Sequence, residues 1–410
     1  MTDDEETPEE IIETPWRARA EAVIPGGAST GSKRFAALFG DAHDEMPTHF
    51  VRASGCRLWT TDGQELVDCT MALGSVAIGY ADAAVAMAVS EAARAGNVSG
   101  LSSVLEVEVA ERLSDVIPCA ERVRFLKSGA EGMAAAVRIA RAHTGRTRVL
   151  GCGYFGWLDW WSDGPGVTPG AHADFTAIPF DDITALEAAA AEAGDALAAI
   201  AIEPVIERLP STAWVESARA ICDERGAVLI FDEMKTGFRL RTGGYQEYSG
   251  ITPDIAVFGK ALANGYPLSA IVGRDAVMRD ASKCWISSTL ASEAVSLAAA
   301  GAVLEWHAQA EVCEGVWAAG EEIMQAVSRA IDASGIGGVS VRGIAPMWLL
   351  DFEDEDQRTR FGELAVEQGV LFKRGAYNFA SLAHEEAEVA EIERAASEAF
   401  VALREELADA

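Results

Sequence analysis

Three apolar runs of this chain end in residues that could carry out proton transfer or attack a carbonyl. The run 197–205 reaches Glu203, the run 227–239 reaches Asp232 and Glu233, and the run that starts at 255 stops at Lys260. Removing an ammonium from water is costly, so a lysine at the end of a buried strand has a lowered pKa. Its neutral amine can then form a Schiff base with a carbonyl. Taken alone, Lys260 is better explained as a strand-end lysine that reaches water.

The spacing of Asp232 and Lys260 favours a shared site. Positions 233–259 separate them, which is enough for one crossover between parallel strands. Ligands of open α/β sheets bind at the carboxyl ends of such strands. A lysine and an acid at this edge suit pyridoxal phosphate, because the lysine binds the aldehyde and the carboxylate keeps the pyridine nitrogen protonated. We therefore expect Lys260 and Asp232 to be catalytic.

A phosphate group would need a separate cradle, and the segment ERVRFLKSGAEG offers one. It reads as a strand, a turn and the start of a helix, with Ser128, Gly129 and Ala130 at the junction. Free backbone N–H groups and the helix dipole favour an anion there, and small residues let it approach closely. The alternative is a serine that only caps the helix. Together with Lys260 and Asp232, the phosphate interpretation is preferred.

Four motifs in chain order resemble those of one enzyme family. They are FLKSGAEGMAAAVRIARAHTGR, GYFGWLDWW, FDEMKTGFR and PDIAVFGKALANGYPLSAIVGR. They are similar to the class III aminotransferases, which are fold-type I pyridoxal-phosphate enzymes, and most similar to the branch that includes glutamate-1-semialdehyde 2,1-aminomutase. The likeness extends from about residue 20 to the C-terminus.

The resemblance implies an α/β fold in two parts. A large domain would hold a mostly parallel seven-stranded sheet between helices, and a small α+β domain would combine the N- and C-terminal segments. We expect residues 1–70 to belong to the small domain, residues 71–306 to form the large domain, and residues 307–410 to complete the small one.

The resemblance also assigns roles around the cofactor. Tyr154 would stack on the pyridine ring, and Met234 would pack on its opposite face. Phe155 follows Tyr154 where the family usually has histidine, which replaces a polar contact by an apolar one. Glu203 would lie near the ring hydroxyl or near Lys260.

Two further assignments from the family involve the substrate and a second subunit. Thr289, with Ser288 nearby, matches a threonine that one subunit contributes to the phosphate site of its neighbour. This implies a homodimer with active sites at the subunit interface. In the aminomutase an arginine in the turn-rich segment near residue 30 binds the substrate carboxylate, and here Lys33 or Arg34 would take that place. A basic surface loop is an equally good interpretation of Lys33 and Arg34.

The family likeness implies an aminotransferase. It would move an amino group from an amine or amino-acid donor to a keto acid, ketone or aldehyde through a Lys260 Schiff base. The alternative is an aminomutase, although the chain has Ala-Ser-Glu at 291–293 where most aminomutases have Gly-Asn-Pro. Decarboxylases, racemases and epimerases use the same cofactor machinery. A non-catalytic binding protein is disfavoured because both Lys260 and Asp232 are present.

Composition excludes several other classes. The 410 residues carry a formal net charge of −31, so no basic surface is expected for nucleic acid. The sequence contains no run of 18 apolar residues, so no membrane span is expected. Seven cysteines without C-x-x-C spacing suggest reduced thiols in a cytoplasmic protein, and we expect no metal. The acidic residues 1–12 are expected to form a loose end.

Patterning along the chain predicts the main elements. A hairpin is expected from 57–60 and 65–69, with Asp62-Gly63 between the strands. Helical periodicity or composition marks several longer segments. These segments are 15–23, 82–95, 105–116, 183–193, 210–224, 310–335 and 385–407.

Overall fold

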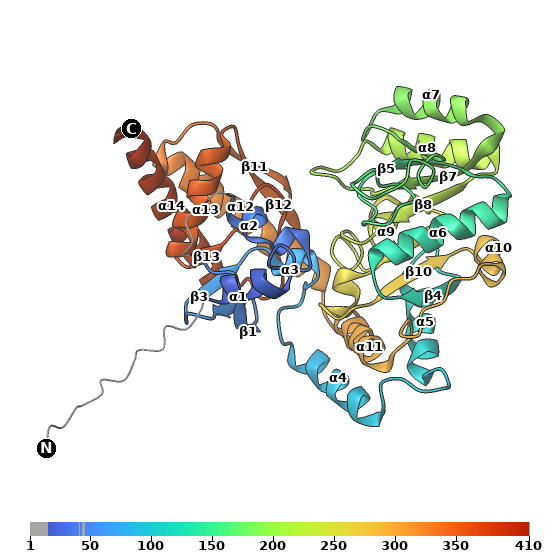
Figure 1. Cartoon of the computed structure of the whole chain (residues 1–410), viewed down its shortest axis with the longest axis horizontal. Coiled ribbons are helices and arrows are strands. Elements are labelled where there is room, and N and C mark those ends of the chain that lie inside the picture. Colours follow the sequence, from blue (N-terminus) through green and yellow to red (C-terminus); the bar gives the residue numbers. More distant parts are fainter. Residues whose placement is uncertain (1–14, 41, 43–45, 410) are drawn as a thin grey trace, which may run out of the picture.

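A sheet of seven strands forms the centre of the larger lobe (Figure 1). The computed structural model describes residues 15–40, 42 and 46–409, so the loose end expected at 1–12 lies outside the described residues. The strands of the sheet are β4 (Arg122–Leu126), β5 (Arg148–Cys152), β6 (Phe175–Ala177), β7 (Leu197–Ile202), β8 (Val228–Asp232), β9 (Ile255–Phe258) and β10 (Ser269–Gly273). Their spatial order is β4-β10-β9-β8-β7-β5-β6.

Most of this sheet is parallel, as expected. The pairs β6–β5, β5–β7, β7–β8 and β8–β9 are parallel, whereas β10 runs antiparallel to both β9 and β4. The central strands are buried and, apart from Asp232 at the end of β8, apolar, which is typical of a sheet covered on both faces. Asp232 pairs with Val257 in the β8–β9 register, so the carboxyl ends of these two strands lie side by side.

Helices cover both faces of the sheet. In the large lobe they are α4 (Ala83–Ala95), α5 (Val104–Val116), α6 (Gly129–Thr144), α7 (Ile183–Ala193), η2 (Gly194–Ala196), α8 (Thr212–Arg225), α9 (Tyr245–Ser249), η3 (Lys260–Ala263), α10 (Asp275–Met278), η4 (Arg279–Lys283) and α11 (Ala294–Gln309). Met133 and Val137 of α6 pack against Val257 on one face, while Trp214 of α8 packs in the core on the other face.

The smaller lobe is built from both ends of the described chain. Its strands are β1 (Phe50–Ser54), β2 (Arg57–Thr60), β3 (Glu65–Asp68), β11 (Val339–Ile344), β12 (Met347–Phe352), β13 (Val370–Leu371) and β14 (Asn378–Phe379). Its helices are α1 (Trp16–Val23), η1 (Gly31–Lys33), α2 (Phe35–Phe39), α3 (Met71–Gly74), α12 (Val312–Ser334), α13 (Glu355–Glu367) and α14 (Glu386–Asp409). β2 and β3 form the expected hairpin, and β13 pairs in parallel with β3. The exact domain boundaries remain predictions.

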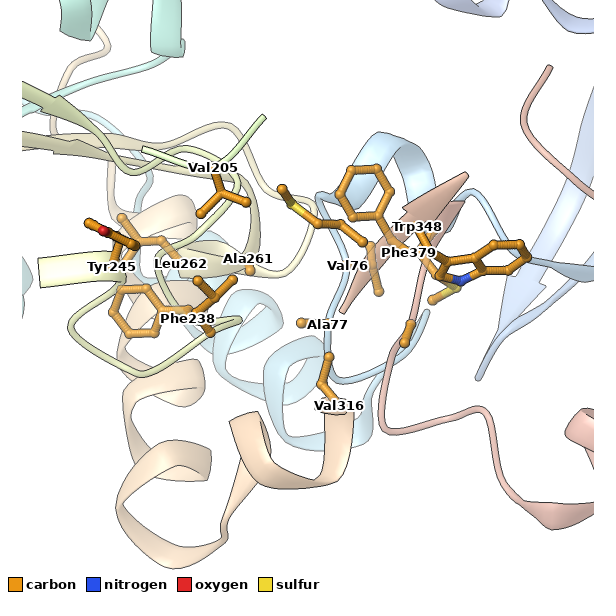
Figure 2. Close-up of a cluster of buried hydrophobic side chains, with 14 of the residues drawn as sticks. Val76, Ala77, Val205, Phe238, Tyr245, Ala261, Leu262, Val316, Trp348 and Phe379 are labelled. Carbon is orange, nitrogen blue, oxygen red and sulfur yellow. The ribbon is translucent and has the colours of Figure 1, made fainter. Parts of the chain in front are cut away.

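An apolar cluster joins the two lobes (Figure 2). Phe238 and Leu262 come from the large lobe, and Trp348 and Phe379 come from the small one. The guanidinium of Arg239 lies in the same region, fully buried. It donates hydrogen bonds to the carbonyl oxygens of Gly74 (2.7 Å) and Ala380 (3.0 Å). Arg239 therefore ties segments that are distant in sequence into one junction.

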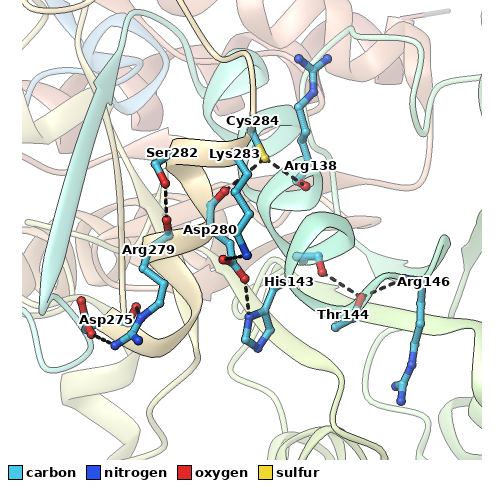
Figure 3. A network of polar contacts seen from close by, with 11 residues as sticks. Arg138, His143, Thr144, Arg146, Asp275, Arg279, Asp280, Ser282, Lys283 and Cys284 are labelled. Carbon is cyan, nitrogen blue, oxygen red and sulfur yellow. Dashed lines mark hydrogen bonds and ion pairs between the residues drawn. The ribbon is translucent and has the colours of Figure 1, made fainter.

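A polar network fixes the segment before residue 285 onto α6 (Figure 3). His143 Nδ1 lies 3.0 Å from Asp280 Oδ2, and the Lys283 ammonium contacts the same carboxylate. Cys284 Sγ lies 3.8 Å from the carbonyl oxygen of Arg138. These contacts hold residues 280–284 in place.

The cysteines form no disulfide. All seven are free thiols, and all but Cys284 are buried. Among the described helices, none is both long enough and apolar enough to cross a membrane.

Candidate active site

Lys260 follows β9 directly and begins η3. Its φ is +50°, the left-handed region, which costs an ordinary residue about 1–2 kcal/mol. The end of this turn is fixed by Asn264, whose Oδ1 accepts hydrogen bonds from the N–H groups of Ala77 (3.0 Å) and Ile78 (3.2 Å). The backbone around Lys260 is thus held in a strained conformation by tertiary contacts, as is common at functional sites.

The environment of Lys260 favours a neutral amine. Burial, together with the positive charge of Lys235, lowers its pKa to about 8, against the raising effect of Asp232 and Glu203. No hydrogen bond or ion pair to another described residue engages its Nζ. A lysine of this kind is available as a nucleophile and as a proton carrier near neutral pH.

Asp232 closes β8 beside Lys260. Its side chain is only 4% exposed, and within the described residues its one hydrogen-bond donor is the backbone N–H of Met234 at 3.0 Å. Burial raises the pKa of this carboxyl to about 7, with a contribution from the neighbouring charge of Glu203. A buried carboxylate with spare acceptor capacity suits a cationic ring N–H.

The start of α6 supplies a candidate phosphate cradle. Ser128 is the N-cap, and its Oγ accepts a hydrogen bond from the Glu131 N–H at 3.3 Å. The Glu131 carboxylate in turn accepts from the Ser128 N–H at 2.9 Å, which completes a capping box. The first N–H groups of the helix, those of Gly129 and Ala130, have no acceptor within the helix and can bind an anion.

A glycine loop packs directly against this cradle. Gly156 has a φ of +85°, and a Cβ at that position would lie 2.3 Å from the Cβ of Ala130. A side chain there is excluded by both conformation and space. The loop that carries Tyr154 is therefore held close to the helix start.

The two aromatic residues of this loop have different surroundings. Tyr154 is 67% exposed, and its ring meets that of Trp161 edge-on at 5.6 Å. Phe155 is 1% exposed and packs among Trp160, Trp161 and Phe175. The Tyr154 ring is free to contact a ligand, whereas the Phe155 ring belongs to a buried aromatic cluster. A cofactor contact of Phe155 remains a prediction.

Met234 lies between the cradle and the lysine strand. A Cβ at Gly129 would lie 2.8 Å from Met234 Cε, and one at Gly259 would lie 2.5 Å from the same atom. The thioether thus links the two segments predicted to bind opposite ends of the cofactor.

Lys235 and Tyr377, two residues that sequence reasoning missed, lie near Glu203. Its carboxylate is buried, accepts a hydrogen bond from the Tyr154 N–H at 3.1 Å, and contacts the ammonium of Lys235. That ammonium also lies 4.1 Å from the centre of the Tyr377 ring. The strand register could have pointed to Lys235. Lys235 lies three residues after Asp232, and Lys260 lies three residues after Val257, the residue that pairs with Asp232. Tyr377 comes from the other lobe and gave no signal.

The remaining predicted residues lie further out. Lys33 and Arg34 are exposed. Lys33 lines a cavity of about 260 Å³ with Asp68 and Ala72, while Arg34 Nε lies 3.4 Å from the carbonyl oxygen of Ala28. Thr289 is exposed in a hollow beside residues 95–103. No described contact joins these three residues to Lys260, and their roles remain predictions.

Comparison with known proteins gives a consistent result. The family model for class-III aminotransferases matches residues 38–156 and 171–392. A glutamate-1-semialdehyde 2,1-aminomutase of Neisseria meningitidis serogroup C is 31% identical over 422 residues, covering 94% of this chain and 97% of that protein. One from Rhodopirellula baltica is 32% identical over 353 residues, covering 81% and 79%.

Solved structures show the same architecture. The FumI protein of Sphingopyxis sp. MTA144, solved with pyridoxal phosphate, superposes with a TM-score of 0.91 at 27% identity, covering 96% of both chains. A transaminase with bound pyridoxal phosphate gives 0.86 at 26% identity, covering 95% and 97%.

Proposed function

The chain belongs to the class III aminotransferase family, and on that basis we propose that it is a pyridoxal-phosphate-dependent aminotransferase. It moves an amino group from an amine or amino-acid donor to a keto acid, ketone or aldehyde. The observation that supports the proposal is the parallel pairing of β8 with β9, because the buried Asp232 ends one of these neighbouring strands and Lys260 follows the other.

The residues present fit the cofactor. Asp232 has a buried acceptor oxygen for the pyridine N–H, and the start of α6 has N–H groups for the phosphate. When bound, pyridoxal phosphate supplies an aldehyde carbon and an electron-accepting ring. We assign its binding to one set of residues: Lys260, Asp232, Ser128, Gly129, Ala130, Tyr154, Phe155, Glu203, Met234 and Thr289.

Lys260 performs the proton transfer in this proposal. With a pKa of about 8, its amine accepts a proton from the carbon that bears the donor nitrogen and returns a proton in the next step. Asp232 remains negatively charged beside the ring nitrogen, and Tyr154 covers one face of the ring. Lys33 or Arg34 binds an acidic group of the substrate.

We further propose that two copies form a homodimer with active sites at their interface. Apolar side chains are exposed on α4, on α5 and on the loops beside them. They include Met87, Leu101, Val104 and Trp285, of which Leu101 is 83% and Trp285 86% exposed. Apolar patches of this kind mark protein interfaces. Thr289 lies in a hollow beside Leu101, where a second copy would reach it.

A cytoplasmic location is proposed from the thiols. Seven free cysteines suit a reducing compartment, in which disulfides do not persist.

An aminomutase is the second candidate, because relatives covering most of the chain bear that name. Product analysis separates the two functions. A transferase forms product only with a separate carbonyl acceptor, whereas a mutase converts a single substrate that holds both groups.

Replacement of Lys260 by alanine tests the proposal. The wild-type protein mixed with pyridoxal phosphate should absorb in the visible range and lose that absorption when an amine donor is added. The Lys260→Ala protein should show neither change, while Lys283→Ala should behave as wild type, because Lys283 is exposed and pairs with Asp280. Full turnover by Lys260→Ala would refute the proposal.

A further inference from the structure

We propose that Lys235 is a positioning residue of this active site, which acts on the Lys260 amine through its own positive charge and through its buried ion pair with Glu203. The inference rests on the proposed function of Lys260. It concerns a residue that does not itself react.

The backbone brings together the two turns that carry these lysines. β8 and β9 are parallel neighbours, and Asp232 is in register with Val257. Lys235 comes three residues after the first of this pair, and Lys260 comes three residues after the second. Met234 lies against Gly259, so the two turns are in contact.

The side chain of Lys235 is held in place on two sides. Its ammonium contacts the Glu203 carboxylate at the end of β7 and lies 4.1 Å from the centre of the Tyr377 ring. Lys235 is mostly buried, with a side chain 12% exposed. Burial lowers the pKa of Lys235, but the charge of Glu203 and the contact with Tyr377 outweigh it, so the pKa is raised. Lys235 is therefore a permanent cation near neutral pH.

The charged groups that face Lys260 come from several segments. Asp232 and Glu203 favour its protonated form, whereas Lys235 and Arg239 oppose it. Glu203 is already paired with Lys235, which weakens its pull on the Lys260 proton. Removing the Lys235 charge should raise the pKa of Lys260 in two ways. It removes a repulsion between two ammonium groups, and it frees the Glu203 carboxylate to attract the Lys260 ammonium.

The test measures the protonation of Lys260 directly in the full-length chain without cofactor. Reductive methylation with formaldehyde at a series of pH values, followed by mass spectrometry of the Lys260 peptide, gives the pH midpoint of its amine. Lys235→Met should raise this midpoint by about one pH unit. At pH values below the midpoint, labelling of Lys260 in Lys235→Met should be about tenfold slower than in the wild type.

Three variants separate charge from shape. Lys235→Arg keeps the charge and should leave the midpoint unchanged. Lys235→Gln can still hydrogen-bond to Glu203 and should shift it as Lys235→Met does, so it replaces the methionine variant if that protein does not fold. Lys283→Met removes an exposed lysine that pairs with Asp280 and should have no effect.

The cofactor-loaded chain provides a second measurement. The pH midpoint of its visible absorption should move upward in Lys235→Met and Lys235→Gln only. The proposal is overturned if both variants keep the wild-type midpoints, or if Lys235→Arg shifts them equally. Labelling of Lys260 does not depend on turnover, so either result leaves the aminotransferase proposal to be judged by its own experiment.

Discussion

At the scale of single residues, the site contains charges that oppose folding until a ligand is present. Asp232 is buried with one hydrogen-bond donor among the described residues, and its pKa is raised to about 7 from an ordinary value of 3.8. A raised carboxyl pKa means that the folded chain holds this proton more tightly than the unfolded chain. The ionised group therefore destabilises the cofactor-free protein increasingly as the pH rises from about 4 to 7.

Replacing Asp232 by asparagine should separate stability from function. We expect the melting temperature of the cofactor-free variant to exceed that of wild type at pH 8 and to differ less at pH 5. Transaminase activity should fall by about 100-fold or more, because the charge beside the ring nitrogen is lost. Calorimetry at both pH values and an activity assay check these outcomes.

Asp254 offers the matched control for this prediction. It is also a buried aspartate beside β9, but it pairs with Arg219 at 2.9 Å and accepts the Leu229 N–H at 2.8 Å. Asp254→Asn should lower the melting temperature at pH 8, opposite in sign to Asp232→Asn. Equal losses in the two variants would contradict the assignment of Asp232 as an uncompensated buried charge.

Sequence reasoning reached some of these residues and not others. Lys260, Asp232 and Glu203 could be found because each ends an apolar run, which is a local signal. Tyr377 could not, because its contact with Lys235 joins two lobes across 142 positions (235 to 377). Lys235 was visible within its motif, but its role depends on a neighbour that only the folded chain provides.

At the scale of elements, the start of α6 combines a stability function with a proposed binding function. Ser128→Ala removes the N-cap and should cost about 1 kcal/mol in the free energy of unfolding. It should also weaken pyridoxal-phosphate binding, because the hydroxyl and the orientation of the cradle are lost. Urea denaturation measures the first effect, and titration with the cofactor measures the second.

Ser211→Ala is the control for Ser128→Ala. Ser211 caps α8 in the same way, with Oγ accepting the Trp214 N–H at 3.3 Å, but it lies outside the proposed site. We expect a similar loss of stability and unchanged cofactor affinity. Unchanged affinity in Ser128→Ala as well would leave Ser128 a helix cap only.

The contact between the Tyr154 loop and α6 makes a second prediction at this scale. Gly156→Ala should lower both stability and cofactor affinity, since the new methyl group would overlap Ala130. Gly166→Ala isolates the cost of backbone conformation, because Gly166 has a similar φ of +92° and no atom within 4 Å of its Cβ position. Thermal melts should show a larger loss for Gly156→Ala, and equal losses would show that close approach is unimportant.

Elements were predicted more completely than their arrangement. The hairpin and the long helices follow from alternation, turn residues and helical periodicity, which are local properties. The position of β10 between β4 and β9, antiparallel to both, depends on pairings that no short segment encodes. The family resemblance, rather than periodicity, supplied the seven-stranded sheet.

At the scale of the whole molecule, the exposed apolar surface predicts association. Leu101→Asp should shift the protein from dimer to monomer, because a charge would be buried at the proposed interface. Analytical ultracentrifugation measures the change. Leu407→Asp on α14 is the control, since Leu407 is also exposed but lies in the other lobe. A wild-type monomer, or a Leu101→Asp dimer, would refute the proposed interface.

The fixed backbone around Lys260 limits how the substrate specificity of this protein can change. The connection 259–268 is short, both of its ends enter strands of a buried hairpin, and Asn264 fastens it to residues 77–79. If Lys260 reacts as proposed, its amine therefore has little room to follow substrates of different shape. We therefore expect mutations selected for altered specificity to spare 259–264 and to fall in other segments near the site, such as the one in the smaller lobe that carries Tyr377.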